Sequence, residues 1–333
     1  MPILLQLILM LFVILVAAEV FTNALEHLGE KLGISEGVTG SVFAAVGTAL
    51  PETIIPLMAL LAGTSDAKIN AEIGVGAILG APLMLSTLSV SLMALAVLPA
   101  RGIRGSFAPE PAGLARDLNA FLIAFALAAL TLYVPHDYAT ARTALAVGLV
   151  VLYLAYVFLT VRASEKLVAD GHGTETDKPL LLTHIGLPKN SVVIAIQLLL
   201  GVSLLIGGAK GFIYGVESGA KVLGISALLL SLLIVPIATE LPEKINSILW
   251  IRRRKDTLAF GNITGAMVFQ GTLLPAIGIM LTPWEHGREV LIGVTLTLLG
   301  ALWMRAVLVR GQIQVWHLLI NGALYITYLA IVL

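Results

Sequence analysis

Two related hexapeptides lie inside long apolar stretches in opposite halves of the chain. Residues 47–52 read Gly-Thr-Ala-Leu-Pro-Glu, and residues 238–243 read Ala-Thr-Glu-Leu-Pro-Glu. Each places a glutamate, Glu52 or Glu243, directly after a helix-breaking proline. A carboxylate at membrane depth costs several kcal/mol, so one that is retained there usually belongs to an ion or substrate path. The two glutamates are therefore predicted to bind a transported ion.

Further oxygen donors accompany both glutamates. Thr48 and Thr239 each precede a glutamate by four residues, and Asn262 adds an amide oxygen in the second half. Proline inside a helix frees backbone carbonyls, which can also bind a cation. A site of carboxylate, hydroxyl, amide and carbonyl oxygens suits Ca2+ or Na+ better than a soft metal. A threonine hydroxyl can instead bond back to its own helix.

The second hexapeptide carries additional charge. Glu240 and Lys244 are four residues apart, so they share a helical face and could form an ion pair. Glu240 also precedes Glu243 by three residues, which would enlarge the acidic site. The sequence leaves both interpretations open.

The composition is that of an integral membrane protein. The 333 residues are 58% hydrophobic and 12% charged, with a mean hydropathy of +0.99. About 20 apolar residues span a bilayer as a helix, and ten such segments occur. They are residues 3–24, 37–62, 71–98, 117–134, 142–161, 191–212, 226–250, 257–281, 289–309 and 313–332. The sequence predicts an all-α membrane protein whose partners are the lipid bilayer and small inorganic cations, with no cofactor and no nucleic acid.

The distribution of basic residues predicts the topology. If the N-terminus is outside, 14 Lys and Arg residues fall in the loops on the inner side and five in the loops on the outer side. The positive-inside rule then places both termini outside and the polar linker in the cytoplasm. We expect a multi-pass protein of a bacterial or archaeal cell membrane.

The two halves are an internal duplication. Residues 50–52 match 241–243, and residues 32–35 match 223–226, at one constant spacing of 191 residues. The predicted organisation is a first five-helix repeat at 1–161, a linker at 162–190 and a second repeat at 191–333. An odd number of helices per repeat gives the copies opposite orientations, as in secondary transporters with inverted repeats and a binding site near the bilayer midplane.

The hexapeptides resemble the GTSLPE signature of the calcium/cation antiporter superfamily. Residues 260–269 are similar to the family's LGNxxGSNxFN pattern, and residues 32–35 to the turn before each signature. The resemblance implies a sodium/calcium exchanger-like fold with alternating access around a central site. Glu52 and Glu243 would then be the two glutamate ligands and Asn262 the amide ligand. Thr48 and Thr239 would supply hydroxyl or carbonyl oxygens.

The chain departs from the family pattern at several ligand positions. Ala77 stands where the first repeat should have Asn or Asp, and Ala49 and Glu240 replace serines. The site thus has fewer neutral ligands and one more carboxylate. Since carboxylates held close together resist joint ionisation, protons should compete with the metal. We therefore expect protons to be a candidate counter-ion.

The leading functional interpretation is a secondary antiporter that exchanges Ca2+ for Na+ or H+. A monovalent antiporter, Na+ or K+ against H+, is the alternative. A passive channel is disfavoured because the predicted site comes from two halves of one chain. The chain is not expected to be an enzyme, because no nucleophile–base set, aspartate pair or His-Glu-x-x-His motif occurs in its segments.

Overall fold

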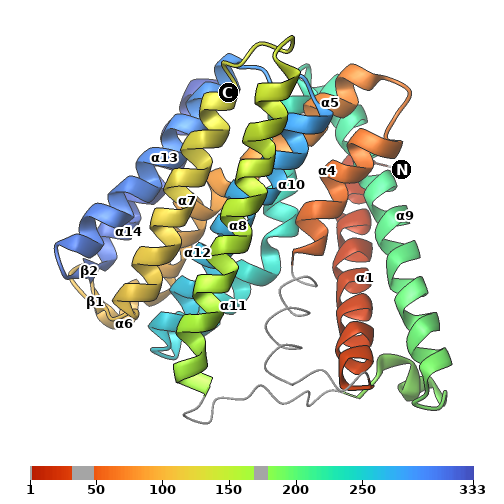
Figure 1. Cartoon of the computed structure of the whole chain (residues 1–333), viewed down its shortest axis with the longest axis horizontal. Helices are drawn as coiled ribbons and strands as arrows, with labels where there is room; N and C mark the ends of the chain where they lie inside the picture. The colour runs from red at the N-terminus through yellow and green to blue at the C-terminus, as the bar shows by residue number, and fades with distance from the viewer. Residues whose placement is uncertain (1, 32–48, 169–178) are drawn as a thin grey trace. The chain divides into compact units, whose positions relative to one another are not determined.

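The computed structural model describes residues 2–31, 49–168 and 179–333. This part of the chain is helical, apart from a two-stranded ladder in which β1 (Ser106–Phe107) pairs antiparallel with β2 (Ile313–Gln314). Eight of the described helical stretches are long and apolar enough to cross a membrane. The helices, labelled in Figure 1, are α1 (Ile3–Lys31), α4 (Leu50–Ala62), α5 (Ala67–Met84), α6 (Val90–Arg101), α7 (Pro111–Thr131), α8 (Ala139–Val168), α9 (Ser191–Leu223), α10 (Ala227–Thr239), α11 (Leu241–Arg252), α12 (Asp256–Leu281), α13 (Arg288–Val309) and α14 (Val315–Val332).

The observed helices refine the predicted segments. The segment expected at 226–250 is divided into α10 and α11, as its prolines indicated. Helix α9 continues to Leu223, well past the predicted end at residue 212. Of the segment expected at 37–62, the structure describes only the part from residue 49 onward.

The chain forms two compact units, and each unit takes residues from both halves of the sequence. The first unit comprises Met1–Asn70 and Leu159–Gly224, and the second comprises Ala71–Phe158 and Ile225–Leu333. The boundaries of these units therefore differ from those of the proposed sequence repeats.

In the first unit, α1 packs closely along α9 (Figure 1). A Cβ atom added at Gly201 would lie 2.9 Å from Phe21 Cα, and one added at Gly215 would lie 2.8 Å from Leu7 Cδ2. Gly201 of α9 thus faces Phe21, and Gly215, further along α9, faces the earlier residue Leu7. The two helices therefore run antiparallel. Small residues at such a seam let helix backbones approach closely without a hydrophobic driving force.

Buried amides attach the C-terminal part of the linker to this helix pair. Gln197 Nε2 donates to Asn23 Oδ1 at 2.9 Å. The backbone N–H groups of Leu181 and Leu182 donate to Asn23 Oδ1 and Gln197 Oε1, each at 2.9 Å. The short 3-10 helix η3 (Leu181–Ile185) is thereby fixed to α1 and α9.

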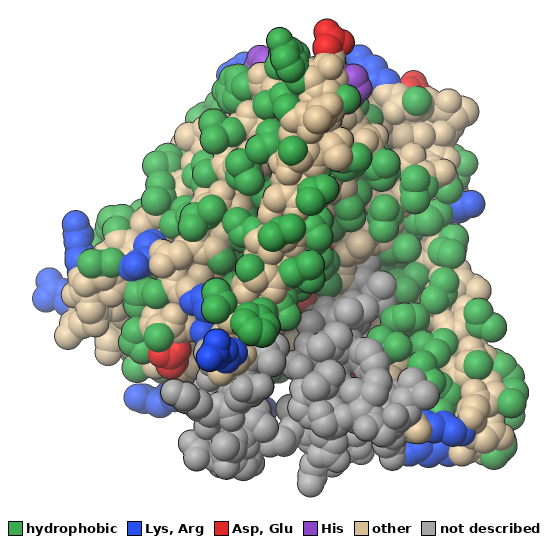
Figure 2. Space-filling model, viewed as in Figure 1, with side chains coloured by type: hydrophobic (Ala, Val, Ile, Leu, Met, Phe, Trp, Pro, Cys, Tyr) green, Lys and Arg blue, Asp and Glu red, His purple; other side chains and the backbone are tan. Residues whose placement is uncertain are grey.

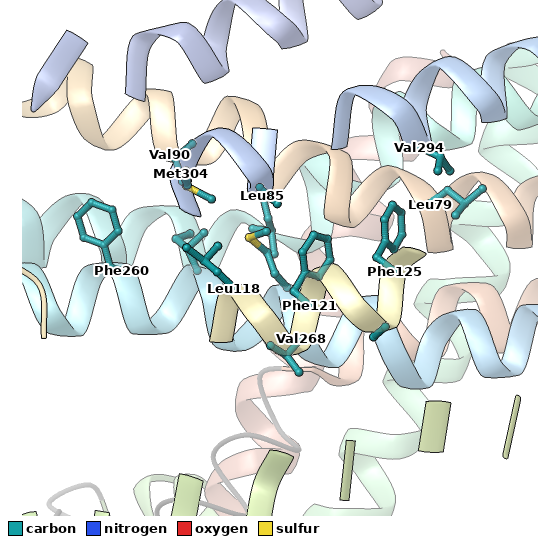
Figure 3. Close-up of a cluster of buried hydrophobic side chains, with 14 of the residues drawn as sticks. Leu79, Leu85, Val90, Leu118, Phe121, Phe125, Phe260, Val268, Val294 and Met304 are labelled. Atoms are coloured by element: carbon teal, nitrogen blue, oxygen red, sulfur yellow. The ribbon is translucent and has the colours of Figure 1, made fainter. Parts of the chain in front are cut away.

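The second unit is built around a large apolar cluster, part of which is shown in Figure 3. Phe121 and Phe125 of α7 stack with ring centroids 5.2 Å apart. Gly271 of α12 makes room for them, because a Cβ there would lie 2.7 Å from Phe121 Cδ2. This packing holds α12 at a fixed position against α7.

Helices α5 and α6 are joined by a turn of π-helix, η2 (Leu85–Ser89), which is also part of the second unit. Asn321 of α14 donates from Nδ2 to Ser86 O at 2.7 Å and to Gly300 O of α13 at 3.0 Å. A π-turn disturbs the regular helical hydrogen bonds. Asn321 compensates by bonding the Ser86 carbonyl and so ties three helical stretches together.

An ion pair stabilises one end of the second unit. Arg101, at the end of α6, binds Asp256, at the start of α12, through two hydrogen bonds of 2.8 and 3.0 Å. Asp256 also accepts from the backbone N–H of Ala108 at 2.9 Å.

Hydrophobic side chains cover α7 and α8 on the face shown in Figure 2. Such a surface is suited to lipid.

Candidate cation site

The two glutamate-bearing helices begin in the same way. The residue before α4 is Ala49, with φ −82° and ψ −3°, and the residue before α11 is Glu240, with φ −83° and ψ 6°. Both helices have proline in the first two positions and a glutamate, Glu52 or Glu243, in the first turn. Proline fits there because the first N–H groups have no helical partner. The positive end of each helix dipole favours the carboxylate.

Glu52 lies in the first unit, where it is 4% exposed. Thr48, the other predicted ligand of the first half, lies outside the described residues. The remaining predicted site residues belong to the second unit, where the junction of α10 and α11 meets α12.

Thr239 is the last residue of α10 and is buried. Its hydroxyl donates to Val235 O at 3.2 Å, which is the back-bonding to its own helix that threonine commonly makes. The hydroxyl oxygen keeps its acceptor capacity, so this bond is compatible with a ligand role.

Glu240 is fully buried at the break between the two helices. Gln270 Nε2 of α12 donates to Glu240 Oε1 at 2.5 Å, and Glu240 Oε2 accepts no hydrogen bond from the described residues. The sequence predictions did not include Gln270. Helical periodicity could have indicated Gln270 as a site residue, because it is eight residues after Asn262 and residues at this spacing share a helical face.

Asn262 joins α12 to the first two turns of α11. Its Nδ2 donates to Glu243 O and to Ser247 Oγ, each at 3.0 Å. Neither bond uses Oδ1, the atom that a hard cation would require. Glu243 is 5% exposed, and its Oε2 has no hydrogen-bond donor within the described ranges.

Lys244 is buried beside these carboxyl-bearing residues. Its Nζ donates to Pro236 O at 2.9 Å. It also lies 2.9 Å from Sδ of Met84, the last residue of α5. Its proposed ion pair with Glu240 stays a prediction. The structure therefore adds a carbonyl and a thioether to the surroundings that the sequence indicated for this ammonium group.

Helix α5 approaches α10 closely at the level of Ala77. A Cβ at Gly76 would lie 2.5 Å from Leu228 O, and one at Gly80 would lie 2.2 Å from Leu232 O. Ala77 itself is buried. Ala77, where the resemblance predicts Asn or Asp, thus lies on a helix that packs directly against α10, which ends next to Glu240.

The second unit therefore gathers two buried carboxylates, an amide, hydroxyls and a lysine around one broken helix. Oxygen donors of this kind bind hard cations such as Ca2+ or Na+. Two carboxylate oxygens without a hydrogen-bond donor are well suited to a cation, since a buried anionic oxygen is costly unless it is paired.

The model of the sodium/calcium exchanger protein family matches residues 2–162 and 193–333. The chain belongs to this family. It is thus a multi-pass membrane transporter of cations and not an enzyme.

Individual relatives are more distant. CaxA of Alkalimonas amylolytica is 25% identical over 298 residues, covering 85% of this chain and 84% of CaxA. The inner membrane protein YrbG of Escherichia coli K12 is 26% identical over 323 residues, covering 92% of this chain and 93% of YrbG.

Solved structures share the fold of this exchanger. The H+/Ca2+ exchanger CAX superimposes with a TM-score of 0.70 at 20% identity, over 99% of this chain and 81% of CAX. The sodium-calcium exchanger NCX_Mj, soaked with Na+ and Sr2+, gives a TM-score of 0.57 at 19% identity, over 98% of this chain and 97% of its own. At these identities the likeness establishes the fold alone.

Proposed function

We propose that this exchanger is a secondary antiporter that moves Ca2+ against H+ or Na+ by alternating access. The observation that carries the proposal is the pair of buried carboxylate oxygens, Glu240 Oε2 and Glu243 Oε2, that lack a hydrogen-bond donor in the described part of the chain. A bound divalent cation would compensate both. The ions in the names of CAX and NCX_Mj, H+ with Ca2+ and sodium with calcium, agree with this choice.

We assign the cation ligands to both halves of the chain. Glu52, Glu243 and Glu240 would supply carboxylate oxygens and Asn262 its Oδ1. Thr239 and Thr48 would supply hydroxyl or carbonyl oxygens. The matched starts of α4 and α11 support equivalent roles for Glu52 and Glu243.

The proposed architecture is two inverted repeats, at residues 1–161 and 191–333. Helices α1 and α9 occupy the first position of each repeat, and they pack antiparallel, as inverted copies should. The family model also covers the two halves and omits most of the linker. The excess of basic residues in one set of loops supports a cytoplasmic linker with both termini outside.

Proteoliposomes test this function directly. Purified protein is reconstituted, and gradients of Ca2+, Na+, K+ and pH are imposed one at a time while Ca2+ uptake is followed. We expect Ca2+ to move against an opposing H+ or Na+ gradient. Transport of Na+ or K+ against H+ without any Ca2+ movement would instead establish the monovalent alternative, which Ala77 favours because it removes a ligand of the divalent ion.

Two variants test the proposed ligands. Glu52→Gln and Glu243→Gln should each abolish exchange, because the amide keeps the size of the side chain but removes the charge that binds the cation. Glu217→Gln is the matched control, since Glu217 pairs with the exposed Lys221 on α9. Exchange at the wild-type rate in either ligand variant would refute the assignment.

A further inference from the structure

The Lys244 ammonium is held at the helix break as an inorganic cation would be. Its Nζ lies 2.9 Å from Pro236 O, a carbonyl that already accepts the backbone N–H of Glu240 at 3.2 Å. Met84 Sδ lies 2.9 Å from the same Nζ. Lysine is almost never this buried without compensation, so the carbonyl and the neighbouring carboxylates are the groups that stabilise its charge.

The charge of Lys244 acts on the carboxylates of both Glu240 and Glu243. Its backbone N–H also donates to Glu240 O at 3.1 Å. Lysine carries a compact point charge with donors and no acceptor. Like Na+ or K+, the ammonium group therefore binds carbonyl and carboxylate oxygens. Unlike those ions, it cannot leave the site.

We propose that Lys244 is a tethered monovalent cation that occupies one inorganic cation position of the site. The proposal rests on the proposed function, in which Glu240 and Glu243 bind the transported cation. Lys244 supplies one positive charge beside these carboxylates that a monovalent ion would otherwise have to supply. The exchanger then binds a divalent ion without a monovalent companion, and Na+ is excluded from the position that Nζ occupies.

Lysine variants test this role by measuring Ca2+ binding in different salts. The purified proteins are wild type, Lys244→Met, which keeps the length of the side chain without charge, and Lys244→Arg, which keeps the charge. Lys221→Met is the matched control, because Lys221 is an exposed lysine paired with Glu217 on α9. Calorimetry gives the dissociation constant of Ca2+ in choline, sodium or potassium chloride at equal ionic strength.

The expected result is a new salt dependence in Lys244→Met. Na+ or K+ should tighten its Ca2+ binding on the order of tenfold relative to choline when the concentration of the monovalent ion is about ten times its dissociation constant from the Ca2+-bound protein, because the vacated position binds the monovalent ion together with Ca2+ and not in its absence. Wild type, Lys244→Arg and Lys221→Met should show no such tightening.

Two outcomes overturn the proposal. One is Ca2+ binding by Lys244→Met that is the same in all three salts. The other is tightening by Na+ or K+ in the wild type, which remains informative when Lys244→Met does not fold. Failure of the wild type to bind or transport any divalent ion would refute the proposed function itself, so the two failures are distinguishable.

Discussion

The close approach of α5 to α10 makes Gly80 a sensitive position. The substitution Gly80→Ala would place a Cβ atom 2.2 Å from Leu232 O and 2.8 Å from Pro236 Cγ. Favourable contacts between heavy atoms begin near about 3.5 Å, so the helices must separate by roughly 1 Å. The nearest atom belongs to the backbone, which cannot turn away as the end of a flexible side chain can.

The energetic effect follows from two opposing terms. Overpacking of this kind costs up to about 3 kcal/mol, whereas alanine is favoured over glycine inside a helix by about 1 kcal/mol. The net destabilisation expected for Gly80→Ala is therefore up to about 2 kcal/mol. Gly148→Ala on α8 is the matched control, since no described atom lies within 4 Å of its added Cβ. It should gain up to about 1 kcal/mol.

Thermal unfolding of the purified variants in detergent measures both effects. Gly80→Ala should lower the Tm and Gly148→Ala should leave it unchanged or raise it. Because α10 leads directly into Glu240, Gly80→Ala should also weaken Ca2+ binding, whereas the control should not. Equal increases in Tm for both variants would show that α5 and α10 are not packed as described.

Three further substitutions test contacts on which the description depends. Gln270→Leu removes the donor to Glu240, so the ion-free protein should lose about 2 kcal/mol; Ca2+ should then raise the Tm of this variant more than that of wild type, and an unchanged response would contradict the contact. Asp256→Asn removes the charge opposite Arg101 and should cost about 2–4 kcal/mol, seen as a lower Tm that added salt does not restore. Gln197→Leu should cost about 1–3 kcal/mol because buried polar partners in the first unit lose their bonds, and limited proteolysis should then cut the C-terminal part of the linker faster.

Much of the architecture could be predicted from local sequence. A bilayer imposes a single requirement on the chain, long apolar helices with satisfied backbones, and composition alone reveals it. The interruption of the seventh segment was equally predictable, because Pro242 cannot continue the helix from the preceding turn. The burial of Glu52 and Glu243 followed from their place within apolar stretches.

The partners of the site residues were less predictable, because they come from distant parts of the chain. Gln270 meets Glu240 only because α12 packs beside the break, and the sequence offered no more than a shared helical face with Asn262. The amide of Asn262 was expected to offer oxygen, yet its Nδ2 is what bonds α11. Spacing along the chain gives no information about which end of an amide faces a neighbouring helix.

The sequence by itself determined that this is a helical membrane protein with an acidic, duplicated motif in broken helices. The tertiary structure decided which groups from other helices surround Lys244. From the sequence, Glu240 could pair with Lys244 or enlarge the acidic site beside Glu243, and both interpretations satisfy helical spacing. In the structure its ammonium group reaches Pro236 O and Met84 Sδ. The contact with Met84 depends on helix packing, because it forms only where α5 lies against the helix break.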